Sequence, residues 1–179
     1  MAGSPSPDPR PERIPGLQAL GAVGTTPDER FDRLTRLARH LFDTPIALLS
    51  LAGSDRRWIE SRIGLDPSRP VPELGFCAQA QLGDDVLIVP DASRDVRFRD
   101  HPLVTDLPEI RFYAGCPVRG PDGRPLGTLC VIDHEPREVR DEDARVLRDL
   151  AWMLEQELKS ASLATVDELT GLTNRRGFD

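Results

Sequence analysis

Three cysteines and three histidines are the residue types in this sequence best suited to redox, covalent or metal chemistry. The cysteines are Cys77, Cys116 and Cys130, and no two of them form a C-x-x-C pair. Their odd number and wide spacing favour reduced thiols over a disulfide framework, which indicates a cytoplasmic protein. Cys116 and Cys130 fall in apolar runs, where burial raises the pKa of a thiol and a structural role is expected.

The histidines give no metal-binding pattern. His40, His101 and His134 are scattered, without an i, i+4 pair or a neighbouring cysteine. The glycines at 120, 123 and 127 are explained by a hairpin rather than by a phosphate-binding loop. We therefore predict no metal site, no catalytic residues and no evident cofactor in this chain.

Charge and hydropathy exclude two classes of partner. The formal net charge is −7, with 30 acidic residues against 23 lysines and arginines, so nucleic-acid binding has little electrostatic support. The longest apolar runs are far too short to cross a bilayer, and the first residues have no signal-peptide core. We expect neither nucleic acid nor membrane as a partner.

The elements that must position these residues can be read from apolar spacing. Helices are predicted at 26–42, 74–82 and 141–164, from stripes at three- and four-residue spacing and from their caps. Strands are predicted at 46–51, 57–63, 86–89, 111–118 and 126–132. The Pro-Asp-Gly triplet at 121–123 predicts a tight hairpin between the last two strands.

This order of elements favours an α+β fold with a central antiparallel sheet of about five strands. The first and last helices should cover one face of the sheet. The short helix and the loops should cover the other face, and we expect a pocket there.

Residues on that second face are the candidates for ligand binding. Tyr113 is favoured because small residues, Gly115 and Pro117, share its strand parity and leave room beside it. Cys116 and Cys130 are candidates for a close thiol pair, because they lie on consecutive strands. The complete set of predicted pocket residues is Trp58, Phe76, Cys77, Gln79, Phe98, Tyr113 and Cys130.

Five ordered blocks of the sequence resemble a family of sensor domains. P-I-A-L-L-S-L, G-F-C-A-Q-A, V-P-D-A-S-R-D-V-R-F, I-R-F-Y-A-G-C-P-V and G-T-L-C-V-I-D together resemble a GAF domain, over roughly 26–164. The ending D-E-L-T-G-L-T-N-R-R-G-F resembles the opening of a GGDEF domain, the fold of diguanylate cyclases.

The two resemblances predict four segments: a flexible N-terminal arm at 1–25, a GAF core at 26–140, a C-terminal signalling helix at 141–166 and the truncated start of a GGDEF domain at 167–179. The parent protein is then expected to convert GTP to cyclic di-GMP. The catalytic G-G-D-E-F loop does not occur in these 179 residues, so we expect no enzyme activity in the fragment itself.

Several specialised GAF chemistries are not matched. Bilin-attaching members usually carry histidine next to the cysteine, whereas Ala78 follows Cys77. The Asn-Lys-Phe-Asp-Glu signature of cyclic-nucleotide-binding members is missing. The resemblance therefore implies only an unidentified small-molecule ligand.

We expect a regulatory module that senses a small molecule, forms a homodimer and relays a signal through its C-terminal helix to the GGDEF domain. The dimer seam is predicted along Leu147, Leu150, Leu154 and Leu158 of that helix. Two alternatives stay open. One is a dimerisation scaffold without a ligand, and the other is a cysteine-based redox sensor or methionine sulfoxide reductase.

Overall fold

The computed structural model describes residues 29–52, 57–66 and 75–170, with side chains described outside 57–60 and 161–170. The predicted N-terminal arm, the start of the first predicted helix at 26–28 and the chain end at 171–179 lie outside these ranges.

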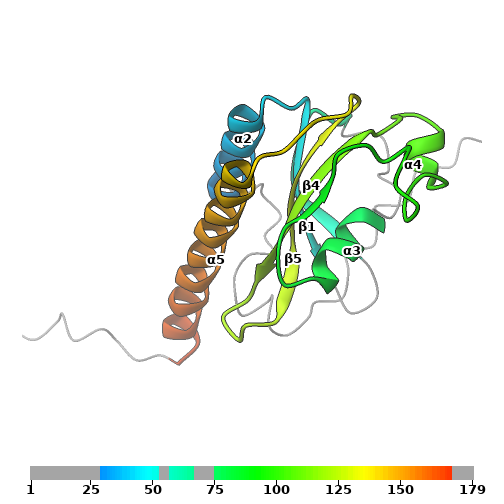
Figure 1. Cartoon of the computed structure of the whole chain (residues 1–179). Helices are drawn as coiled ribbons and strands as arrows, with labels where there is room; N and C mark the ends of the chain where they lie inside the picture. The colour runs from blue at the N-terminus through cyan, green and yellow to red at the C-terminus, as the bar shows by residue number, and fades with distance from the viewer. Residues whose placement is uncertain (1–28, 53–56, 67–74, 171–179) are drawn as a thin grey trace, which may run out of the picture.

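A five-stranded antiparallel sheet forms the centre of the protein (Figure 1). Its strands are β1 (Ile46–Ala52), β2 (Arg57–Ile63), β3 (Leu87–Val89), β4 (Phe112–Arg119) and β5 (Pro125–Asp133). They lie in the order β2-β1-β5-β4-β3, and every neighbouring pair is antiparallel. The predicted α+β fold and its antiparallel sheet are confirmed.

The hairpin between β4 and β5 forms as the Pro-Asp-Gly triplet predicts. The backbone N–H of Gly123 donates to the carbonyl of Gly120 at 2.9 Å, and Gly123 has a φ of +79°. Only glycine adopts that conformation without a steric penalty. This turn sets the register in which Cys130 pairs with Gly115 and Leu129 with Cys116.

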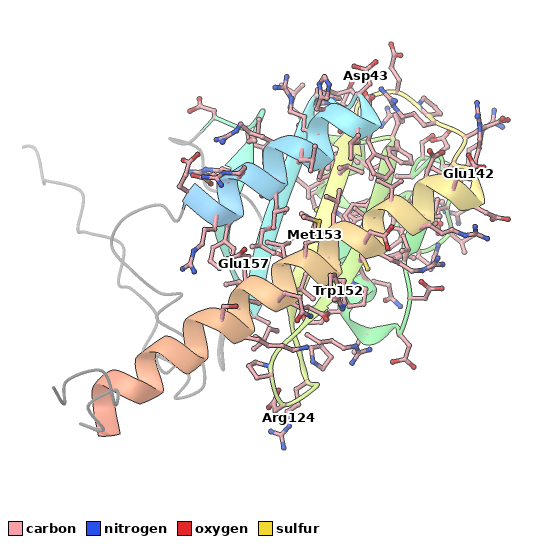
Figure 2. The ribbon with its side chains drawn as sticks, turned by 90° about the vertical axis from the view of Figure 1, so that its left-hand side faces the viewer. Asp43, Arg124, Glu142, Trp152, Met153 and Glu157 are labelled. Carbon is pink, nitrogen blue, oxygen red and sulfur yellow. The ribbon has the colours of Figure 1, made fainter. Side chains whose placement is uncertain are left out.

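Two helices cover one face of the sheet. They are α2 (Glu29–Phe42) and α5 (Asp141–Thr170), which run side by side in opposite directions (Figures 1 and 2). Between the helices and the sheet lies the larger apolar core, with Phe31, Leu34, Leu49, Phe112 and Leu129 among its members. The predicted helical layer is therefore confirmed.

The leucine stripe of α5 belongs to this core. Leu147, Leu150, Leu154 and Leu158 are all buried and pack toward the sheet and α2. The predicted dimer seam along these four leucines is wrong, because a side chain that is already buried within its own chain has no surface left for a partner. The near-heptad spacing marked a core-facing stripe, which uses the same periodicity as a coiled-coil seam.

The opposite face of the sheet is covered by α3 (Gly75–Leu82), α4 (Pro102–Thr105) and the segment between β3 and β4 (Figure 1). A second apolar cluster lies beneath them, with Ile46, Leu48 and Ile132 from the strands. Because both faces of β1 are buried, its sequence is a nearly continuous apolar run instead of an alternating one.

Arg137 fastens the start of α5 to the end of α2. Its guanidinium forms a 2.6 Å ion pair with Asp133 and donates to the carbonyl oxygens of Phe42, at 3.0 Å, and Asp43. The guanidinium thus binds three acceptors, and such charge-assisted hydrogen bonds are stronger than those between neutral groups. The connection that precedes α5 is thus anchored to the helical layer.

Candidate functional site

The short helix α3 forms a roof over the second face of the sheet, and two side chains hold it there. The hydroxyl of Thr128 on β5 donates to the carbonyl of Cys77 at 3.2 Å, and the amide of Gln81 donates to the carbonyl of Pro125 at 3.1 Å. Both bonds connect α3 to β5. The position of Cys77 above the sheet is therefore determined by β5.

Aromatic rings fill the space between α3 and the β3–β4 segment. Phe76 of α3 stacks on Phe98 with ring centroids 4.1 Å apart, and it lies 5.1 Å from the ring of Tyr113. The imidazole of His101 meets the ring of Phe76 edge-on at 5.4 Å. Phe76, Phe98 and Tyr113 are buried, so this part of the face is packed with protein.

Two thiols and a phenol meet beneath α3. The Sγ atoms of Cys77 and Cys130 lie 3.8 Å apart, and the hydroxyl of Tyr113 donates to the Cys77 Sγ at 3.4 Å. Burial raises the pKa of Tyr113 well above its ordinary value, and burial also raises the pKa of Cys130. Both groups are protonated at neutral pH, which suits a hydrogen-bonded apolar cluster better than a nucleophile.

The absence of a side chain at Gly115 leaves the space that the Tyr113 ring occupies. The phenol ring lies over the glycine, and a Cβ atom at position 115 would overlap the ring and its hydroxyl. The room that small neighbours were predicted to leave beside Tyr113 is therefore taken up by the ring itself. The strand parity that was predicted for Tyr113 is confirmed, because its side chain lies in the cluster beneath α3.

Cys116 lies on the other side of the sheet. Its neighbours are the helix-covered core residues, whereas Cys130 belongs to the cluster under α3. The predicted pairing of Cys116 with Cys130 is wrong, because these residues sit one position out of register and so have opposite parity. Burial, with the Asp85 and Glu155 carboxylates, raises the pKa of Cys116 to about 12.

Ser50 provides the one unpartnered group found among the described buried side chains. Its hydroxyl is buried without a hydrogen-bond partner. Ser50 pairs across the strands with Thr128 and shares the parity of Leu48, so it faces the α3 side of the sheet. Leaving a buried hydroxyl without any hydrogen bond costs roughly 1–3 kcal/mol, and a buried water or a ligand can supply the bond that the protein does not make.

A comparison of the sequence with known protein families supports the resemblance noted above. The GAF domain family matches residues 26–158. The chain belongs to the GAF domain family. A cyclic di-GMP phosphodiesterase of Pseudomonas aeruginosa is 40% identical to this GAF chain over 177 residues, which is 98% of the chain and 30% of the relative. The chain thus spans less than a third of the length of that relative.

Solved structures share the fold of this GAF domain. A free methionine-R-sulfoxide reductase from Neisseria meningitidis superposes with a TM-score of 0.62 and 21% identity, over 83% of this chain and 89% of the other. The GAF domain of an Acinetobacter phosphoenolpyruvate-protein phosphotransferase gives a TM-score of 0.61 and 14% identity, over 86% and 98%. At these identities the likeness concerns the fold alone.

Five of the seven predicted pocket residues come together in this GAF domain: Phe76, Cys77, Phe98, Tyr113 and Cys130. Gln79 lies instead on the outer side of α3, where it lines a surface hollow of about 360 Å³ with Leu82 and Asp84. The side chain of Trp58 lies outside the described residues. Sequence reasoning missed Ser50, whose only signal is a polar residue within the apolar run of β1.

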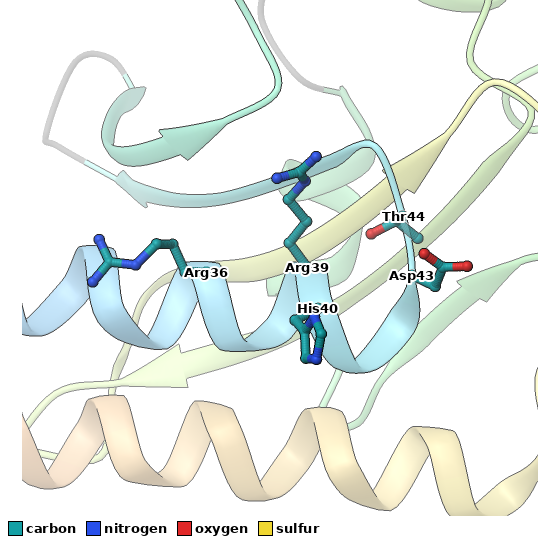
Figure 3. Close-up of a pocket in the computed structure, with 5 residues that line it drawn as sticks. All are labelled: Arg36, Arg39, His40, Asp43 and Thr44. Atoms are coloured by element: carbon teal, nitrogen blue, oxygen red, sulfur yellow. The ribbon is translucent and has the colours of Figure 1, made fainter.

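A second hollow, of about 390 Å³, lies at the C-terminal end of α2 (Figure 3). Arg36, Arg39 and His40 line it together with Asp43 and Thr44. The three basic side chains point in different directions, and Arg36 is already paired with Glu29 at 2.9 Å. This hollow therefore lacks the convergent groups of a binding site.

Two histidines of the GAF domain, His101 and His134, serve local structure. The Nδ1 of His101 accepts from the backbone N–H of Leu103 at 3.1 Å and caps α4, while burial lowers the pKa of His101. His134 contacts the carbonyl of Pro108 through its Nδ1 at 2.7 Å. Across the described ranges, no three His, Cys, Asp or Glu side chains gather where they could hold a metal ion.

None of the helices in the described part of the chain combines the length and the apolar character needed to cross a bilayer.

Proposed function

We propose that this chain is the sensory module of a cyclic di-GMP signalling protein. In this proposal a small molecule binds on the α3 side of the sheet, and α5 relays the change to a C-terminal domain. Membership of the GAF family supports a sensory role, and the 40% identical relative, which is named a cyclic di-GMP phosphodiesterase, supports the signalling system. The segment at 167–179, which resembles the opening of a GGDEF domain, supports the type of C-terminal domain.

The unpartnered hydroxyl of Ser50 is the observation that carries the sensing part of this proposal. It is buried on the face predicted to bind a ligand, next to Thr128, whose hydroxyl holds α3. A ligand with a hydrogen-bonding group would satisfy Ser50 and would displace α3 or its neighbours to enter. Binding at Ser50 is therefore coupled to the position of the roof.

The relay part rests on the continuity of α5. This helix runs unbroken from Asp141 to Thr170. It packs into the sheet core from Leu147 to Leu158, and its C-terminal end runs away from the sheet (Figure 2). A rigid helix that is part of the core at one end transmits a shift or rotation to its other end.

The reaction that the sensory module would regulate is the synthesis or the breakdown of cyclic di-GMP. A GGDEF-type neighbour implies synthesis from GTP, whereas the Pseudomonas relative carries the name of a phosphodiesterase. A sensory module is compatible with either direction, because it acts on the C-terminal domain through α5 and not on the nucleotide.

A metabolite screen by thermal shift tests this function. A true ligand present at about 100 times its Kd adds about 2.7 kcal/mol to the free energy of unfolding. The shift should be reduced in Ser50→Ala, and the same compound should change cyclic di-GMP turnover by the longer protein. A ligand that leaves turnover unchanged, or a screen without any hit, would contradict the sensory role.

The packed rings of Phe76 and Phe98 favour a second function, a scaffold without a ligand. If the cluster beneath α3 is only a core, Ser50→Ala should not alter the response to any compound. Turnover by the longer protein should then be independent of small molecules.

A thiol enzyme is the third candidate, and the 3.8 Å separation of Cys77 and Cys130 is the observation that favours it. Against it, Cys130 is buried with a raised pKa, and Cys116 lies across the sheet. We expect no reduction of free methionine sulfoxide in the presence of a dithiol reductant. Turnover that depends on Cys77 would restore this candidate.

A further inference from the structure

The turn that follows α3 contacts α5 at the edge of the sheet formed by β3. It comprises residues 83–86 and connects the roof helix directly to that edge strand. The backbone N–H of Gly83 donates to the carbonyl of Ala80 at 3.2 Å, so the turn begins within the last turn of α3. Any displacement of α3 therefore displaces these residues as well.

Arg148 of α5 holds the turn through its guanidinium. Its Nη2 donates to one carboxylate oxygen of Asp85 at 3.0 Å, and its Nε donates to the other. Asp85 also accepts the backbone N–H of Val86 at 2.7 Å, which fixes the carboxylate within the turn. Such a bidentate pair has a defined geometry, unlike most ion pairs between flexible side chains. The hydrogen bond from Arg148 also holds the pKa of Asp85 below its ordinary value.

A second connection passes through Arg119 at the end of β4. The carboxylate of Glu155 on α5 accepts the backbone N–H of Arg119 at 2.8 Å, and the Arg119 guanidinium donates to Asp84 at 3.0 Å. Arg148 and Glu155 lie on the same side of α5, because the seven positions between them make about two helical turns. We call the bonds of this set the turn–α5 contacts: Asp84, Asp85, Arg119, Arg148 and Glu155.

We propose that the turn–α5 contacts couple the position of the roof helix α3 to the position of α5. When α3 is displaced, Asp85 moves with the turn and either pulls Arg148 along or releases it. In both cases α5 is held differently at this point. The inference rests on the proposed sensory function, in which a ligand near Ser50 displaces α3, and it gives the relay a route around the β3 edge of the sheet.

Coupling between two sites is reciprocal, so it can be measured from either end. If displacement of α3 alters how α5 is held, a substitution on α5 that breaks the contacts must loosen α3. This direction needs neither a ligand nor the C-terminal domain. Hydrogen exchange measures such local loosening, because the amides of a loosened element exchange faster than those of the core.

Hydrogen exchange of the 179-residue chain, followed by mass spectrometry, gives the test. Arg148→Gln should raise the exchange rate of the α3 amides about two- to threefold, a modest effect because Asp85 and Arg148 are both partly exposed. The amides of β1 are the internal reference and should exchange as in the parent chain. Arg145→Gln is the matched control, since Arg145 is another exposed arginine of α5 and has no ion pair within the described part of the chain.

A double substitution decides whether Asp85 and Arg148 act as a pair. Asp85→Asn keeps an acceptor for the N–H of Val86 but loses the charge that Arg148 binds. Combined with Arg148→Gln, it should leave the α3 exchange rate about where Arg148→Gln alone places it, because the same contact is already broken.

Unchanged exchange of α3 in Arg148→Gln, an equal acceleration of β1, or effects that multiply in the double variant would each overturn the coupling. None of these measurements uses a ligand or cyclic di-GMP turnover. Their failure is therefore distinct from a failure of the sensory function.

Discussion

Two hydroxyl groups face α3 from neighbouring strands, and they differ in what they bind. Thr128 donates to the carbonyl of Cys77, whereas Ser50 has no partner. Thr128→Val should therefore lower the free energy of unfolding by about 1 kcal/mol, while Ser50→Ala should leave it unchanged or raise it by up to about 1 kcal/mol. Urea denaturation of the two variants measures the difference. A larger loss in Ser50→Ala than in Thr128→Val would mean that Ser50 is already satisfied.

Close contact of Tyr113 with Gly115 gives a second residue-scale prediction. Gly115→Ala should lower the free energy of unfolding by about 1–3 kcal/mol, because its methyl group displaces the Tyr113 ring. Gly83→Ala is the matched control, since a Cβ there meets neighbours at 3.5 Å or more, and it should change stability by less than about 0.5 kcal/mol. Equal effects in urea denaturation would contradict the role of Gly115.

The buried thiol of Cys116 predicts how stability depends on pH. Its pKa is near 9 when unfolded and about 12 when folded, so below pH 9 both states hold the proton. Above pH 9 only the unfolded state releases it, and stability is lost at up to about 1.4 kcal/mol per pH unit for this thiol.

Urea denaturation at pH 8, 9 and 10 checks this slope. The loss should be smaller in Cys116→Ala, which keeps the contributions of Cys130 and Tyr113. A slope that is the same in both proteins would show that Cys116 does not contribute to it.

At this scale the sequence predicted five of the residues that meet on the α3 side. It did not predict that their side chains pack against one another and fill the expected pocket. Strand parity separated Tyr113 from Phe112 and Cys116, because the alternation of side chains along a strand is a local property. Whether Cys116 and Cys130 face the same side depends on the register of β4 against β5. That register is determined by the hairpin geometry, which places the two cysteines on opposite sides of the sheet. Ser50 could not be recognised, since a missing hydrogen bond is a property of the packed structure.

At the scale of elements, Arg137 is the joint between the helical layer and the sheet. Arg137→Ala should lower the free energy of unfolding by about 1.5–3 kcal/mol, because the backbone carbonyls of Phe42 and Asp43 and the Asp133 carboxylate lose a charged donor. Arg94→Ala, whose side chain is mostly exposed, should cost less than about 0.5 kcal/mol. Thermal denaturation compares the two variants. Equal melting temperatures would contradict the stabilising role of Arg137.

The elements themselves were largely predictable. Apolar patterning and end signals located α2, α3, α5 and all five strands, because each element buries at least one side and β1 buries both. The leucine stripe of α5 shows the limit of such reasoning. A stripe indicates that a helix buries one side, and whether the sheet or a partner covers that side depends on the tertiary fold.

At the scale of the whole molecule, the two faces of the sheet have separate tasks in the proposed function. The α3 face holds Ser50 and the aromatic cluster, where a small molecule would be sensed. The other face carries the helical layer, through which the signal would leave. Both apolar clusters contain residues of β1, β4 and β5, and in the proposed function these shared strands would carry a change from one face to the other.

Insertions into α5 of the longer protein test the relay most directly. Each alanine inserted after Ser160 turns the following helix by about 100° and lengthens it by about 1.5 Å, so seven alanines return it to within about 20° of its original orientation. One or two alanines should abolish or invert the regulation of cyclic di-GMP turnover, and seven should restore it. Turnover that responds equally to all insertions would show a flexible tether at this point and would contradict the relay.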